Sequence, residues 1–121
     1  MELTFYDVGG SAIAYCDDGR LIYSFSGIPL AYLDGDSVHG FDGMHLGWWD
    51  HGWVRDHHGA WVFFTESSVG GPPIPAKRAR PGKGYKNVPT VAAFKNPKPV
   101  PPTGGLGWSS RSGAQFFQRL P

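Results

Sequence analysis

A pattern of residues occurs four times in the first part of this chain, and it constrains the fold more than any other feature. The pattern is centred on Gly10, Gly27, Gly43 and Gly59, which are spaced 17, 16 and 16 residues apart. An apolar residue stands five positions before each glycine, an aliphatic residue three after it and an aromatic residue five after it. Self-similarity at a nearly fixed period predicts repeated structural units.

Each copy has the composition of a β-hairpin. The run Leu21–Phe25 is rich in residues that favour strands and ends at Ser26-Gly27, and the next run, Ile28–Leu33, ends at Asp34-Gly35. Turn signals at this short spacing are typical of antiparallel strands. The glycines supply the positive φ that tight hairpin turns require. An amphipathic helix is disfavoured because glycines interrupt every window with helical apolar spacing.

Four hairpins in series can bury a common face by closing on themselves, which also removes exposed strand edges. The sequence therefore predicts an all-β domain over residues 1–69, built from four consecutive β-hairpin repeats arranged around a pseudo-four-fold axis. The positions three and five after each glycine are large and apolar, so we expect their face to be the buried one. The small residues between them, Ala14, Ala31 and Gly47, indicate a close backbone approach near the axis.

Charge and proline divide the chain in two. Residues 1–69 contain all ten acidic residues and two basic ones, a net charge of −8, whereas residues 70–121 contain nine basic residues and no acid, a net charge of +9. Ten of the eleven prolines follow Gly71. We therefore expect residues 70–103 to form an extended, basic, proline-rich segment. It is either a mobile linker or lies along the acidic body, and the opposite charges favour docking.

The last part of the chain, residues 104–121, carries a short helical signal. Ser112 and Gln115 have the spacing of a capping box, which predicts a short helix over residues 112–120. Trp108, Phe116 and Phe117 then form an anchor that returns the tail to the body. The alternative is a short motif that docks on a partner, but so short a helix is not stable alone in water.

Several segments together resemble a known family. The succession of YxxxG-x-x-[IVL]-[AG]-aromatic units in residues 23–35, 45–48 and 62–66 is similar to the small bacterial four-fold β-flower proteins. The Lys/Pro-rich stretch 72–102 and the terminal Trp108…Phe117 element match that family as well. The resemblance implies four hairpins around a pseudo-four-fold axis. It implies no activity and no functional residues.

The histidines are the main candidates for chemistry. All five lie within residues 39–58, interleaved with aspartates: His39, His45, His51, His57 and His58. Imidazole and carboxylate groups are good ligands for zinc and other divalent ions. However, His39, His45, His51 and His57 occupy different positions relative to their glycines, so they need not converge. We interpret them as turn and surface residues and predict no metal, no cofactor and no catalytic residue.

Three function hypotheses follow. The favoured one is a non-enzymatic binding or scaffolding module for an unidentified protein partner, using outward aromatic side chains such as Trp49, Trp53 or Trp61. The second is nucleic-acid binding through the basic tail, where Lys77, Arg78 and Arg80 cluster. The third is a metal-dependent hydrolase that uses the histidine-rich third and fourth repeats. A single cysteine, Cys16, and the lack of a visible signal peptide or long apolar run predict a cytoplasmic protein without membrane contact.

Overall fold

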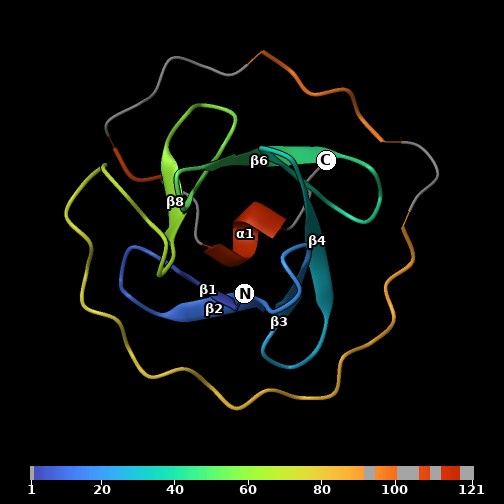
Figure 1. Cartoon of the computed structure of the whole chain (residues 1–121), viewed down its shortest axis with the longest axis horizontal. Coiled ribbons are helices and arrows are strands. Elements are labelled where there is room, and N and C mark those ends of the chain that lie inside the picture. Colours follow the sequence, from blue (N-terminus) through green and yellow to red (C-terminus); the bar gives the residue numbers. More distant parts are fainter. Residues whose placement is uncertain (1, 92–94, 101–106, 110–112, 118–121) are drawn as a thin grey trace.

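The strands form a closed antiparallel barrel in a computed structural model, which describes residues 2–91, 95–100, 107–109 and 113–117. Neighbouring strands in the barrel are consecutive in sequence, and β8 pairs with β1 to complete the ring (Figure 1). The all-β prediction is confirmed. The strands are β1 (Leu3–Tyr6), β2 (Ala12–Cys16), β3 (Leu21–Ser24), β4 (Pro29–Asp34), β5 (Ser37–His39), β6 (His45–Asp50), β7 (Trp53–Arg55) and β8 (Trp61–Phe64).

A short C-terminal helix, α1 (Gly113–Phe117), is also present as predicted. Figure 1 shows it at the centre of the ring of strands. Residue 112 and residues 118–120 of the predicted helix lie outside the described residues. No helix in the described part of the chain is long and apolar enough to cross a membrane.

The four glycines that define the sequence pattern all sit in the same kind of turn. Each glycine N–H donates a hydrogen bond of 2.9–3.0 Å to the carbonyl oxygen three residues earlier. Each glycine also has a φ between 81° and 95°, a conformation that disfavours side chains. The turns therefore explain why glycine recurs: Gly10 follows β1, Gly27 follows β3, Gly43 follows β5 and Gly59 follows β7.

The barrel interior is filled by two columns of the pattern. The apolar residues five before each glycine, Phe5, Ile22, Val38 and Val54, are at most 1% exposed and belong to one cluster. Ala14 and Ala31 from the small column belong to the same cluster, and Phe63 takes their place in the last copy. Small side chains fit here because an eight-stranded barrel leaves little interior space.

Most residues three and five after each glycine are buried as expected, but the two columns do not share one face of the strands. Tyr15 lies between Ala14 and Cys16, which face the interior, so its ring points outward. A register shift between Phe5 and Tyr6, opposite Ala14 and Ala12, also interrupts the alternation at Ile13. Tyr15 is nevertheless only 1% exposed, because a second layer of rings covers the barrel from outside.

This outer layer consists of cross-strand pairs where one hairpin meets the next. Tyr6 stacks on Phe64, Tyr15 on Tyr23 and Tyr32 on His39, with ring centroids 5.2–6.1 Å apart. Trp48 is opposite Arg55 in the corresponding register. Stacked pairs of this kind contribute about 0.5–1.5 kcal/mol each beyond the area that they bury. Trp53 and Trp61 are buried as well, so neither offers the outward surface expected of them.

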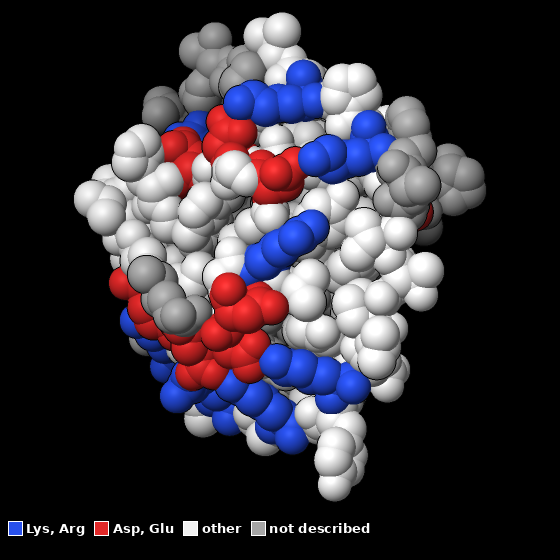
Figure 2. All heavy atoms as spheres, turned by 45° about the vertical axis from the view of Figure 1, so that its right-hand side comes forward, with Lys and Arg blue, Asp and Glu red and all other residues white. Residues whose placement is uncertain are grey.

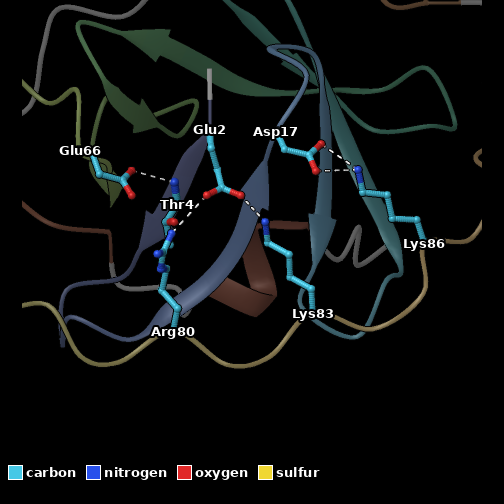
Figure 3. A network of polar contacts seen from close by, with 7 residues as sticks. All are labelled: Glu2, Thr4, Asp17, Glu66, Arg80, Lys83 and Lys86. Carbon is cyan, nitrogen blue, oxygen red and sulfur yellow. Dashed lines mark hydrogen bonds and ion pairs between the residues drawn. The ribbon is translucent and has the colours of Figure 1, made fainter.

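The barrel closes through a side chain as well as through its backbone. Strands β1 and β8 are registered at one position only, Tyr6 opposite Phe64. Beyond it, the Glu66 carboxylate accepts a 2.8 Å hydrogen bond from the backbone N–H of Thr4, a fully buried residue (Figure 3). The carboxylate thus takes the place of the carbonyl that a longer β8 would supply.

Replacing Glu66 by alanine is expected to destabilise the closure. The Thr4 N–H then loses its acceptor in a buried site, which costs on the order of 1–2 kcal/mol of unfolding free energy. Urea denaturation followed by tryptophan fluorescence measures the loss. Glu66→Gln is the matched control, because its amide oxygen still accepts; equal destabilisation by both variants would contradict this account.

Candidate binding surface

The basic segment comprises residues 72–100, and its described residues lie around the outside of the barrel. Figure 1 shows it, from yellow to orange, as an outer ring around the strands. Its described residues, 72–91 and 95–100, contain no helix and no strand. It is held to the barrel by three kinds of contact: backbone hydrogen bonds at the turns, cations over aromatic rings, and ion pairs.

Within the described residues, backbone hydrogen bonds fix the segment at three glycine turns. The N–H groups of Arg78, Asn87 and Asn96 donate to the carbonyl oxygens of Gly10, Gly27 and Gly43 at 2.7–2.9 Å. Gly84 N–H adds a bond to Phe25 O. These contacts use backbone groups on both sides, so they position the segment independently of its side chains.

The turn glycines are also needed because the segment lies directly against them. A Cβ at Gly27 would stand 1.7 Å from the carbonyl oxygen of Tyr85, and one at Gly10 would stand 1.9 Å from that of Ala76. By contrast, a Cβ at Gly35, which also has positive φ, meets nothing within 4 Å. Gly10 and Gly27 therefore serve two purposes, the turn and the close approach of a second chain segment.

Lysines of the segment cover the outer aromatic layer. Lys86 Nζ lies 5.0 Å from the Tyr23 ring, Lys83 Nζ lies 4.3 Å from Tyr15, and Lys77 Nζ lies 5.7 Å from Tyr6. A cation over a tyrosine face is attracted by the ring quadrupole. The aliphatic stems of these lysines also shield rings that a bare barrel would expose.

Two of these lysines, Lys83 and Lys86, also pair with acidic residues of the barrel. Glu2 lies between Arg80 and Lys83, and Asp17 faces Lys86 at 2.7 Å (Figure 3). Further along the segment, Lys95 pairs with Asp34 and Lys98 with Asp36. Figure 2 shows acidic and basic side chains side by side on one face. Each exposed pair contributes about 0–1 kcal/mol, so charge adds to the backbone contacts without replacing them.

The ion pairs also shift the protonation of their members. The hydrogen bond from Lys83 lowers the pKa of Glu2, and that from Lys95 lowers the pKa of Asp34. Correspondingly, the pairs raise the pKa of Lys86 and of Lys95. The charged forms of Glu2, Asp34, Lys86 and Lys95 are thus favoured.

Three of the five histidines lie together at the edge of this surface. The rings of His39 and His57 both contact the His45 ring at 5.1 Å between centroids, and His45 Nδ1 lies 2.9 Å from His57 Nε2. On its other side, His45 Nε2 lies 3.1 Å from Ser37 Oγ. Burial, followed by the charges of His57 and His39, lowers the pKa of His45 to about 4. His45 is therefore neutral at pH 7.

The histidines are joined to the basic segment through Asn96. Its side-chain oxygen accepts a hydrogen bond from the His45 backbone N–H, and its carbonyl oxygen lies 3.2 Å from His39 Nε2. His51 is apart from the other histidines and pairs with Asp50, and His58 lies in the turn held by Asp56. Within the described residues, no group of three His, Cys, Asp or Glu side chains has the geometry to hold a metal ion.

The three aromatic residues of the C-terminal element all contact the barrel. Trp108 packs edge-on against Trp53 and Phe64. Phe116 and Phe117 both pack on Phe63, and Phe116 lies against Gly47, where a Cβ would stand 3.0 Å from its ring. Trp108 of the C-terminal element thus contacts the outer aromatic layer, whereas Phe116 and Phe117 of α1 contact the interior residue Phe63.

Sequence reasoning did not single out the acidic residues that contact the basic segment. Glu2, Asp17, Asp34 and Asp36 differ from acids such as Asp7 and Asp56, whose carboxylates accept backbone hydrogen bonds within their own turns. Asp17, Asp34 and Asp36 lie at the turns between β2 and β3 and between β4 and β5, and this shared position was a usable signal. The contacts of Asn96 could not be predicted, because nothing in the sequence distinguishes it from other loop asparagines.

Comparison with known protein families identifies the fold. The model of the 4-fold beta flower protein family matches residues 3–117. The chain belongs to this family. The match spans the barrel, the basic segment and the described part of α1, so all three are parts of one beta flower chain. Neither the curated proteins nor the solved structures searched contain a significant match to it.

Alanine at Gly27 is expected to displace the basic segment of this beta flower protein. The new Cβ collides with the Tyr85 carbonyl in addition to straining the positive φ, so we expect a loss of more than about 2 kcal/mol of unfolding free energy. Gly35→Ala, which strains φ alone, is expected to cost about 1 kcal/mol. Chemical denaturation of both variants makes the comparison. Equal losses of unfolding free energy in the two variants would show that the close approach of the segment to Gly27 does not contribute to stability.

The buried histidine predicts an acid-sensitive fold. Because the pKa of His45 falls from 6.5 to about 4 on folding, the unfolded chain binds a proton more readily. Stability is therefore expected to decrease as pH falls from about 6.5 to about 4, by about 3 kcal/mol from this group. His45→Gln should flatten this part of the profile measured by urea denaturation. His58→Gln, at an exposed turn, should leave it unchanged; a flattened profile in that variant would contradict the assignment.

Proposed function

We propose that this protein is a non-enzymatic binding module for a protein partner. The outer surface of its barrel binds an extended basic segment of that partner. The observation that carries the proposal is that the outer surface already binds one such segment, its own. Arg78, Asn87 and Asn96 use backbone donors, so another chain of similar conformation can form the same bonds. We further propose that the barrel consists of four hairpin repeats about a pseudo-four-fold axis. The backbone hydrogen bond to an extended chain then recurs from one repeat to the next around the ring.

The exposed side of the basic segment supports a protein partner rather than a small ligand. Tyr85, Val88 and Val100 are 89–97% exposed, although their neighbours Lys86 and Lys98 contact the barrel. Apolar side chains on the outside of an ordered segment are typical of surfaces that contact other proteins. The chain's own basic segment then acts as a bound ligand, and a protein partner either displaces this segment or binds next to it.

The test uses the full chain with its own segment weakened. Lys86→Glu and Lys95→Glu together place like charges opposite Asp17 and Asp34, so the outer surface becomes accessible while its acids stay intact. A fluorescent peptide with the sequence of residues 74–100 is expected to bind this double variant at least ten times more tightly than the wild-type chain. Fluorescence anisotropy measures both affinities, and rising salt should weaken them.

A matched control removes the acids from the same receptor. Asp17→Asn and Asp34→Asn, added to the double variant, should weaken peptide binding about tenfold, because two ion pairs are lost. Absence of peptide binding to every receptor at 1 mM peptide, on the order of the weakest affinities measured for recognition, would contradict the proposal. Tighter binding of a single-stranded oligonucleotide than of the peptide would favour the nucleic-acid alternative instead.

A further inference from the structure

We infer that the outer surface of the barrel recognises an extended chain in units of nine residues, one unit for each glycine turn. The inference rests on the proposed function and adds to it the spacing and chemistry of the ligand. It follows from two sequence repeats of different length: the hydrogen-bond acceptors recur with one period in the barrel, and the donors recur with a shorter period in the basic segment.

The two periods meet at the backbone hydrogen bonds. The donors Arg78, Asn87 and Asn96 are nine residues apart, whereas their acceptors Gly10, Gly27 and Gly43 are 17 and 16 residues apart. A lysine precedes each donor, at positions 77, 86 and 95. Residues 74–100 therefore contain three units whose lysine and donor recur in register with three hairpins.

The spacing has a geometric cause. An extended chain without internal hydrogen bonds rises about 3.1 Å per residue, so nine residues can span at most about 28 Å. One inserted residue lengthens a unit by about 3 Å, which is enough to move a backbone donor out of hydrogen-bond range. Regular turns on the barrel thus impose a regular spacing on any chain that bonds to them all.

The lysine of each unit contacts an aromatic ring of the barrel, an acidic side chain, or both. Lys77 lies over Tyr6, Lys86 lies over Tyr23 and pairs with Asp17, and Lys95 pairs with Asp34. Tyr6 and Tyr23 stand four residues before their glycines, where His39 stands in the third copy. At that third turn the residue after the lysine is recognised through its side chain also, because Asn96 Oδ1 accepts the His45 N–H.

These contacts define the class of ligand. It is an extended, proline-containing peptide with lysine at every ninth position, each lysine followed by a residue that is not proline. Proline is excluded there because it has no N–H to donate to the turn glycine. At other positions of the unit proline is compatible, as Pro81 and Pro89 show in the chain itself.

The experiment compares peptides that differ only in spacing. The receptor is the full chain with Lys86→Glu and Lys95→Glu, and its fold is checked against wild type by the fluorescence of the buried tryptophans. The first peptide is residues 74–100 with one glycine added at each end. The second contains the same two glycines inserted after positions 82 and 91 instead, which gives a ten-residue spacing at identical composition and length. A third peptide carries Asn87→Pro in the first.

The nine-residue spacing is expected to bind at least ten times more tightly than the ten-residue spacing, and Asn87→Pro is expected to weaken binding about fivefold or more. Equal affinities of the first two peptides would overturn the nine-residue register and leave the proposed function standing. If no peptide binds the receptor or the wild-type chain, the register and the proposed function both fail. A receptor that does not fold is replaced by the wild-type chain at higher peptide concentration, where the same ratio decides.

Discussion

The outer aromatic layer is the constraint on which the rest of this structure depends. Eight short strands close into a barrel whose limited interior is filled by one cluster of side chains that includes Phe5 and Phe63. The rings of Tyr15, Tyr23 and Phe64 belong to separate clusters and point outward. Left in water, these rings would form an apolar surface around the whole barrel. The chain covers them with its own later residues: lysine stems and backbone over the tyrosines, and Trp108 over Phe64 and Trp53. The barrel and the basic segment are therefore parts of one folded unit, which agrees with a family match that spans both.

The contact between the two parts combines a rigid element with an adjustable one. Hydrogen bonds between backbone groups at Gly10, Gly27 and Gly43 fix the position of the segment. At Gly10 and Gly27 glycine is required because a side chain would occupy the space of the segment. Ion pairs of Glu2, Asp17, Asp34 and Asp36 add attraction that weakens with salt. A surface that holds a chain mainly by backbone bonds can exchange it for another of the same conformation. This physical property supports the proposed binding role.

The histidines illustrate how far a sequence pattern can be followed. Their different positions relative to the repeated glycines made convergence unnecessary, and His51 and His58 indeed lie apart from the others. His39, His45 and His57 nevertheless meet, because β5, β6 and the turn after β7 are neighbours along the barrel edge. Sequence period alone cannot reveal such a contact, since it joins non-equivalent positions of different copies. The result is a neutral, buried His45 beside Asn96, which links the acid stability of the barrel to the seating of the basic segment.

The sequence by itself determined the all-β class, the positions of the turns and the short C-terminal helix, because glycine spacing and alternation act locally along the chain. It also revealed that opposite charges are divided between two regions of the chain. It did not determine which face of each strand points inward, since both faces are apolar and only closure of the barrel, with its limited interior volume, separates small residues from large ones. Nor could it determine the register of the basic segment on the barrel. That register depends on the distance between neighbouring turns around the closed ring, a length that exists only in the tertiary structure.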